Sequence, residues 1–591
     1  MSRKQTCTVV WIASAMTALL MTLSMATFAD TFQVGPLNPE FQAWLETKGA
    51  ADTNYGYIPS PVDWSHLRTS GGKGASIYAS RFDWRDTDSL TPVKFQDDCG
   101  ACWAFAACGV LEAWSLIHEE QTWDFSENHM KNTHGFVFGP CAGGNNDIAT
   151  AYLARWTGPV SEADDPYNPD VHTSPPNVPP QKRLWSAPVF VDLENGEGDA
   201  HDPIKGAIMT YGPVSSAITW VESAFNPATS TYYYSGSSLE NHAITIVGWD
   251  NTKVVPGAPF PGAWICKNSW GESFGESGYF YISYYDTKAC KKATGFYSLT
   301  DPYSTEYVYQ YDPLGLTVST GGGSNTAYAA NVFQARADET LVAVGTYARV
   351  DNTIYEIIIY NSGLVGSGFA NPVATVSGTL QNAGYHMIPL PGGVPVTEGN
   401  TFTVRVKYTT PGWQHPIPLE APIAGYAAPT AATGQSFISG NGNYFEDIQG
   451  YYAGGNVCIK AFAGYIAPPV PTVRIVGSPH AEIGTRVVLS STVTNMTGTV
   501  TYVWFKDGTA LPGAIAPEYI IPELEESHAG SYVLEATDES KGIYTSPPFV
   551  LEVLTEGALP VSGALQVAAL ALLAAGAVTL RRRVRPVTQD R

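Results

Sequence analysis

The stretch Gln-Asp-Asp-Cys-Gly-Ala-Cys-Trp-Ala-Phe at positions 96–105 decides the fold of the first half of this chain. From Trp103 to about Glu119 apolar residues recur with helical periodicity, so we predict a helix whose first turn holds Cys102. The positive end of a helix stabilises a thiolate, and we therefore expect a lowered pKa for the Cys102 thiol. Cys102 is the candidate nucleophile.

Two later segments offer the groups that such a nucleophile needs. His242 opens a β-branched run that predicts a buried strand, and an imidazole carries protons near neutral pH. Asn268 follows a second short strand, where its side chain would accept the imidazole N–H and fix the ring. Trp270, two residues on, would shield that hydrogen bond from water.

Together these segments resemble the papain-family cysteine peptidases, whose signature is Cys-Gly-[Ser/Ala]-Cys-[Trp/Tyr] with a distant His and Asn. The resemblance covers residues 81–302 and implies a papain-like α+β fold. It implies that Cys102 attacks a peptide carbonyl while His242 serves as acid and base and Asn268 orients the imidazole. Gln96 and the backbone N–H of Cys102 would then stabilise the oxyanion. No cofactor is implied.

The resemblance also implies a disulfide and a substrate site. Positions 141–144 read Cys-Ala-Gly-Gly and match the family's Cys-x-Gly-Gly, so a bond between Cys99 and Cys141 is expected. Asn145 and Asn146 stand where the family often has an aromatic residue and a proline, which leaves the side-chain preference open. The expected substrate-contacting residues are Gly143, Gly144, Trp270, Ala217 and Ala243.

The pair Cys99 and Cys102 also has the spacing of zinc and dithiol motifs. The sequence has no second CxxC unit, no His-x₃₋₅-His pattern and no βαβ context, so we expect no metal site and no redox site there. We expect Cys108, inside the predicted helix, to be inert packing. A bond between Cys266 and Cys290 remains possible, and Cys458 has no assigned partner.

Both ends of the chain carry apolar segments. Residues 1–29 have two early basic residues, an apolar run and small residues before position 30, which predicts a cleaved signal peptide. Residues 556–591 hold a long uncharged segment followed by arginines, which predicts a membrane anchor. Leu-Pro-Val-Ser-Gly at 559–563 resembles a sortase signal with Ser in place of Thr, and the tail also resembles exosortase-type signals. A membrane and a sortase-type processing enzyme are therefore expected partners, with a plain transmembrane anchor as the alternative.

Residues 30–80 are expected to be a propeptide without the long helical pattern of better-known propeptides. Within them the Pro-stiffened segment Tyr57–Trp64 is predicted to lie in the active-site cleft and to block it. The sequence from Arg81 to Arg85 resembles the start of a mature papain-like enzyme.

Two β domains are expected after the peptidase domain. Short alternating runs in 303–466, among them Thr340–Arg349, Thr353–Tyr360 and Thr401–Thr409, predict a β-sandwich or jelly roll, and Val487–Thr494 predicts a strand of a further β domain. The first of these β domains resembles the lectin-like domains of bacterial surface peptidases. That resemblance implies a glycan or cell-wall ligand, and a purely structural spacer is the alternative. Residues 467–555 resemble an immunoglobulin-like domain with Trp504 in its core and Tyr532 at a tyrosine corner, although Leu534 stands where a paired cysteine would be.

The charge balance of 32 Lys+Arg against 54 Asp+Glu gives a net charge of −22, which argues against a nucleic-acid partner. Two hypotheses follow. The first is a secreted cysteine endopeptidase, made as a zymogen, anchored at the cell surface and acting on polypeptides. The second is a surface adhesin whose peptidase domain is inert.

Overall fold

The computed structural model of this chain describes residues 32–47, 55–67, 78–191, 202–302, 306–464, 471–494, 496, 499–539 and 542–554. The predicted signal peptide (1–29) and the predicted anchor (556–591) lie outside these residues. Within the described ranges, no helix is both long and apolar enough to cross a bilayer.

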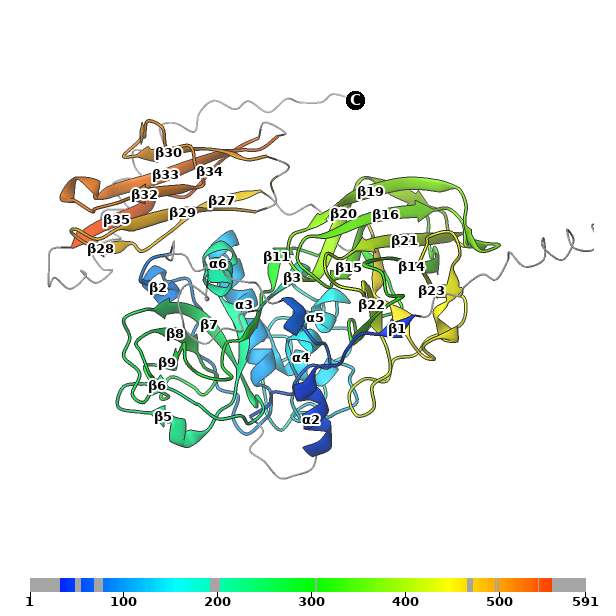
Figure 1. Cartoon of the computed structure of the whole chain (residues 1–591), viewed down its shortest axis with the longest axis horizontal. Helices are drawn as coiled ribbons and strands as arrows, with labels where there is room; N and C mark the ends of the chain where they lie inside the picture. Colours follow the sequence, from blue (N-terminus) through cyan, green and yellow to red (C-terminus); the bar gives the residue numbers. More distant parts are fainter. Residues whose placement is uncertain are drawn as a thin grey trace, which may run out of the picture.

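The first domain has a helical side and a β side (Figure 1). Its helices are α3 (Cys102–Glu119), α4 (Glu127–Thr133), α5 (Asn146–Ala154) and α6 (Asp202–Tyr211). Its strands are β2 (Arg81–Asp83), β3 (Arg183–Val191), β4 (Val214–Ile218), β5 (Phe225–Asn226), β6 (Thr231–Tyr232), β7 (His242–Asp250), β8 (Ala263–Lys267), β9 (Tyr279–Ser283), β10 (Lys292–Thr294) and β11 (Tyr297–Thr300). The sheet order β3-β10-β4-β7-β8-β9-β6-β5 places β7 at its centre.

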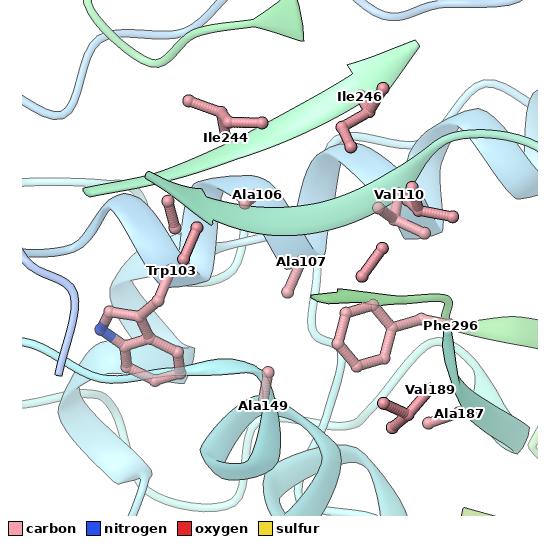
Figure 2. Packing of buried hydrophobic residues seen from close by; sticks show 14 of the residues in the cluster. Trp103, Ala106, Ala107, Val110, Ala149, Ala187, Val189, Ile244, Ile246 and Phe296 are labelled. Carbon is pink, nitrogen blue, oxygen red and sulfur yellow. The ribbon is translucent and has the colours of Figure 1, made fainter. Parts of the chain in front are cut away.

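Helix α3 is the core element of this domain and begins at Cys102, as predicted. It is apolar on nearly all sides and is buried along most of its length, which is typical of a helix enclosed by other elements. Figure 2 shows Ala107 and Val110 of α3 facing Phe296, with Ile244 and Ile246 of β7 above the helix. This packing fixes the first turn of α3 against the start of β7.

The second domain is a β-sandwich with a separate apolar core. One layer has the strand order β19-β16-β21-β14-β23-β24, and the other contains β12-β26-β15-β20 and β1-β13-β22-β25. Its strands are β12 (Tyr307–Tyr309), β13 (Val318–Gly321), β14 (Thr326–Gln334), β15 (Glu339–Ala348), β16 (Thr353–Tyr360), β17 (Leu364–Val365), β18 (Gly368–Phe369), β19 (Pro372–Leu380), β20 (Gly384–Val396), β21 (Thr401–Thr409), β22 (Ile417–Glu420), β23 (Ser436–Ser439), β24 (Glu446–Asp447), β25 (Asn456–Val457) and β26 (Ile459–Ala463).

One continuous sheet joins the first two domains. Strand β20 of the second domain pairs antiparallel with β3 of the first, with His386 opposite Ser186 and Gly384 opposite Pro188. The sheet therefore runs without a break from β12 to β5. Because main-chain pairing crosses the boundary, the two domains hold a fixed relation to each other.

The residues before β2 contact both domains. Strand β1 (Gln33–Val34) pairs with β13 of the second domain, and helix α2 (Pro39–Thr47) follows it (Figure 1). Leu37 forms a bridge with Val62, so the chain returns alongside itself after α2. The predicted propeptide therefore docks on the second domain as well as on the first, which the sequence did not indicate.

The third domain consists of two facing sheets around Trp504, which is fully buried. Its strands are β27 (Thr472–Val476), β28 (His480–Glu482), β29 (Val487–Thr494), β30 (Thr501–Lys506), β31 (Thr509–Ala510), β32 (Glu518–Ile521), β33 (Gly530–Thr537), β34 (Ile543–Thr545) and β35 (Phe549–Leu554). Tyr532 Oη donates to His528 O at 2.8 Å, the contact expected of a tyrosine corner. The immunoglobulin-like assignment stays a prediction.

Candidate active site

The candidate nucleophile lies where the helical side meets the β side. Cys102 begins α3, and no side chain caps this helix end, so its first N–H groups are free to act on the sulfur. The backbone N–H of Ala243 donates to Cys102 Sγ at 3.2 Å. Since Ala243 directly follows His242 on β7, this contact brings the thiol beside the imidazole.

The candidate base is held by two neighbours. His242 Nε2 and Asn268 Oδ1 are 2.8 Å apart, and Trp270 stacks on the imidazole at 4.5 Å between ring centroids. No described residue hydrogen-bonds to His242 Nδ1. With Nε2 engaged by Asn268, Nδ1 is the ring atom left to exchange a proton with a thiol. The arrangement of Asn268 and Trp270 is the one that the sequence predicted.

Gln96 lies six residues before the nucleophile, and Ser269 fixes the orientation of its side chain. Ser269 Oγ donates to Gln96 Oε1 at 2.6 Å, which turns Gln96 Nε2 toward Cys99 O at 3.0 Å. The backbone N–H of Ser269 also donates to Asn268 Oδ1 at 2.9 Å. Ser269 thus orients both amides of the site, a role that the sequence did not reveal.

The cleft segment, Tyr55–Ile58, fills the site. Gln96 Nε2 donates to Tyr55 O at 2.9 Å, and the Tyr55 ring lies 5.9 Å from the His242 ring and 5.5 Å from the Trp270 ring. The prediction placed the start of the blocking segment at Tyr57. The structure shows that Tyr55 already contacts the candidate catalytic residues Gln96 and His242.

Gly144 pairs with this segment in the manner expected for an extended chain. The N–H of Ile58 donates to Gly144 O at 2.8 Å, and the N–H of Gly144 donates to Gly56 O at 3.0 Å, in parallel register. A Cβ on Gly144 would lie 2.4 Å from the Trp103 ring, so only glycine allows the main chain to present itself here. Gly143 is also covered, since a Cβ there would lie 2.9 Å from the Ile58 side chain.

Closure of the cleft sets the charge state of the site. Burial raises the pKa of the Cys102 thiol to about 12, although the N–H groups of Ala243, Trp103 and Cys102 act in the opposite direction. Burial lowers the pKa of His242 to about 4, and the hydrogen bond to Asn268 offsets only part of this. The expected lowering of the Cys102 pKa is therefore wrong for the closed state, because loss of water outweighs the helix end.

The remaining predicted residues have clear positions. Cys99 and Cys141 form a disulfide with a Cα–Cα distance of 4.8 Å. Ala217 and Ala243 are buried partners on β4 and β7, so the structure places them together. The other described cysteines, namely Cys102, Cys108, Cys266, Cys290 and Cys458, are buried and reduced. No group of three or more His, Cys, Asp or Glu among the described residues is arranged to hold a metal ion.

The second domain also reaches the cleft, through Tyr426. Asn145, directly after Gly144, donates from Nδ2 to Ile58 O at 3.0 Å and to Tyr426 Oη at 3.0 Å. Asn145 Oδ1 caps α5 by accepting from the N–H groups of Asp147 and Ile148. Sequence reasoning missed Tyr426, because nothing near it in the chain signals a site.

Comparisons with known proteins agree with this geometry. Residues 78–300 match the family described as papain family cysteine protease, and residues 308–463 match the family described as lectin like domain. The chain is 32% identical to a viral cathepsin of Heliothis zea nuclear polyhedrosis virus over 201 residues, which is 34% of this chain and 50% of the cathepsin. It is 31% identical to cathepsin S of Bos taurus over 223 residues, 37% of this chain and 64% of the relative. The chain thus spans about half to two thirds of these relatives.

A solved structure with both kinds of domain is also similar. The structure of the cysteine protease and lectin-like domains of Cwp84, a surface layer associated protein of Clostridium difficile, has a TM-score of 0.63 and 27% sequence identity. It covers 74% of this chain and 99% of that chain. A structure of the clostridial protease Cwp84 after propeptide cleavage has a TM-score of 0.58 and 28% identity, and covers 66% of this chain and 100% of that one.

Proposed function

We propose that the chain is a secreted, surface-associated cysteine endopeptidase made as a zymogen. The proposal is supported by the matches of residues 78–300 to the papain family cysteine proteases and of residues 308–463 to the lectin like domain. The observation that carries the proposal is the joint placement of Cys102, His242 and Asn268, with the thiol against the residue after His242 and the imidazole on Asn268 at 2.8 Å. Polypeptides in extended form are the proposed substrates.

The geometry supports a thiolate mechanism. His242 Nδ1 takes the proton of Cys102, and the thiolate forms a bond to the carbonyl carbon of the substrate. Gln96 Nε2 and the N–H of Cys102 stabilise the negative oxygen, because such donors act where charge develops. The C–N bond then breaks as His242 returns its proton to the leaving amine. Water, deprotonated by His242, hydrolyses the thioester and releases the acid.

The zymogen proposal rests on the cleft segment. Tyr55 O occupies the Gln96 amide, and Gly56 and Ile58 occupy Gly144, so no substrate has room there. The raised pKa of Cys102 and the lowered pKa of His242 keep both groups neutral in this closed state. The relative described after propeptide cleavage supports removal of the segment before activity.

Surface association and a glycan ligand are further parts of the proposal. The sequence patterns of residues 1–29 and 556–591 support export and anchoring, and the similar clostridial protein is described as surface layer associated. A cell-wall or glycan ligand is proposed for the lectin-like domain on the basis of its family.

The test compares the unprocessed chain with a processed chain, cut between residues 67 and 78 so that the preceding segment is released. Both are incubated with an irreversible peptidyl-epoxide probe and a fluorogenic peptide, and the adduct is mapped by mass spectrometry. We expect rapid labelling of Cys102 and peptide hydrolysis only in the processed chain, both lost in Cys102→Ala. A processed, folded chain without adduct or hydrolysis would instead favour the adhesin with an inert peptidase domain.

A further inference from the structure

The lectin-like domain places one aromatic side chain at the wall of the cleft. The turn that carries Tyr426 is closed by a bridge between Ile423 and Ala427, and the N–H of Tyr426 donates to Ile423 O at 3.0 Å. Val137 of the protease domain donates its N–H to Tyr426 O at 3.2 Å. Tyr426 is therefore fixed by main-chain bonds within its own domain and across the boundary.

The Tyr426 ring completes an aromatic cluster with the protease domain. Its centroid lies 5.1 Å from Phe136 and 5.8 Å from Phe138, which belong to the loop before Cys141. Rings at such distances attract one another beyond simple burial. Phe136, Phe138 and Tyr426 are named the aromatic wall.

A side chain of the preceding segment fills the space against this wall. Phe41 of α2 packs edge-on to Tyr426 at 5.3 Å and is fully buried. Phe41 leaves with the propeptide, whereas all three wall residues remain. The wall thus already accommodates an aromatic side chain that does not belong to the mature enzyme.

The wall is continuous with the main-chain site. Asn145 donates from one amide nitrogen to both Tyr426 Oη and Ile58 O, and Ile58 pairs with Gly144. A chain that lies along Gly144 therefore has the Asn145 side chain between its own main chain and the Tyr426 hydroxyl.

We propose that the aromatic wall is a substrate subsite shared by the two domains, and that Tyr426 makes it select an aromatic side chain of the polypeptide. This rests on the proposed peptidase function. The occupant is an aromatic residue of the substrate because Phe41 holds that place in the closed state. The Tyr426 hydroxyl accepts a hydrogen bond from Asn145 and so fixes that side chain, and the Tyr426 ring contacts the aromatic side chain of the substrate as it contacts Phe41.

The experiment uses the processed chain and alanine-rich fluorogenic peptides in which one Phe is moved through positions on either side of the scissile bond. We expect one position at which Phe raises kcat/KM. Tyr426→Ala should lower that gain, measured as the ratio of kcat/KM for the Phe peptide to kcat/KM for the all-alanine peptide, by up to about tenfold, the upper value for one aromatic pair. Tyr426→Phe should keep the gain, and Tyr444→Ala, an exposed tyrosine of the same domain, should change neither peptide.

Equal losses for both peptides in Tyr426→Ala, or an undiminished gain, would overturn the proposal. Should Tyr426→Ala fail to fold, Phe138→Ala tests the same wall at a half-buried position. Calorimetric binding of the Phe and alanine peptides to the processed Cys102→Ala chain separates the two claims. One outcome is that the wild type shows no hydrolysis while its preference for the Phe peptide in binding still depends on Tyr426. In that case the peptidase function fails and the subsite stands. Without a Tyr426-dependent preference in binding, the subsite is wrong whatever the turnover.

Discussion

Replacing Gly56 by alanine should open the cleft before any cut is made. Gly56 has a φ of +115°, and a Cβ there would lie 2.3 Å from the carbonyl carbon of Gly100 and 2.6 Å from its oxygen. Because these are backbone atoms on the disulfide-bonded stretch that includes Cys99, no change of rotamer relieves the clash. The cleft segment must move away from Gly144.

The magnitude follows from what the closed state loses. A non-glycine residue in such a conformation costs about 1–3 kcal/mol. The two hydrogen bonds between Gly144 and the segment contribute about 1 kcal/mol each. Taking the lower end of this sum, a loss of about 3 kcal/mol changes the ratio of open to closed molecules by about a hundredfold.

The assay is the rate at which a peptidyl-epoxide labels Cys102 in the unprocessed chain, followed by mass spectrometry. We expect about a hundredfold faster labelling in Gly56→Ala, up to the rate of the processed chain. Gly392→Ala is the matched control, because Gly392 also has a positive φ of +80° but no heavy atom within 4 Å of its Cβ position. Labelling of folded Gly56→Ala at the wild-type rate would refute the claim that this pairing keeps the site closed.

Three further outcomes are expected. The ring of His66 stacks on Trp413 at 3.7 Å, and burial followed by the Arg349 guanidinium lowers its pKa to about 4 while Asp63 opposes this. Its ordinary pKa is 6.5, so the contribution of His66 to the affinity of the detached segment 32–67 for the processed chain is full above pH 6.5 and falls toward pH 4, by at most about tenfold per pH unit. Calorimetry at several pH values should show a shallower fall for His66→Gln, with the remainder due to His242. Ser269→Ala should lower kcat about tenfold with KM unchanged in steady-state kinetics, because the Gln96 amide loses the hydrogen bond that orients it. Tyr532→Phe should destabilise the third domain by about 1 kcal/mol. Hydrogen exchange in residues 471–554 should then be faster than in the wild type, while exchange in the other domains is unchanged.

Some strands with regular alternation could be predicted from the sequence to the residue, whereas others, such as β15 at Glu339–Ala348, differ from the alternating run (Thr340–Arg349) by one residue at each end. The predicted runs at Thr353–Tyr360, Thr401–Thr409 and Val487–Thr494 coincide with β16, β21 and β29. Strand β20 was missed because Gly384–Val396 holds three prolines and a Gly-Gly pair, which are turn signals, and its pairing with β15 contains an irregularity. There tertiary pairing overrides local preference.

The candidate catalytic residues could be located in the sequence for a different reason. Cys102, His242 and Asn268 each stand at the start or end of an element with its own sequence pattern, so local motifs located them. Tyr426 has no such pattern, and its hydrogen-bond partner Asn145 lies 281 residues earlier. The pKa of Cys102 was also beyond local reasoning, because it depends on which segment covers the sulfur.

The sheet shared by the first two domains determines whether they stay together when the segment before the cut, residues 32–67, is released. Arg349 of the lectin-like domain donates to Asp63 O at 2.8 Å and lies 4.1 Å over the Trp64 ring, so the segment is held by both domains and release must break both sets of contacts. The pairing of β3 with β20 involves neither the segment nor the cleft, so it survives release. In the proposed zymogen, the lectin-like domain therefore stays against the protease domain on activation, and Tyr426 stays at the cleft. For this reason its domain acts as one wall of the substrate site rather than as an independent appendage.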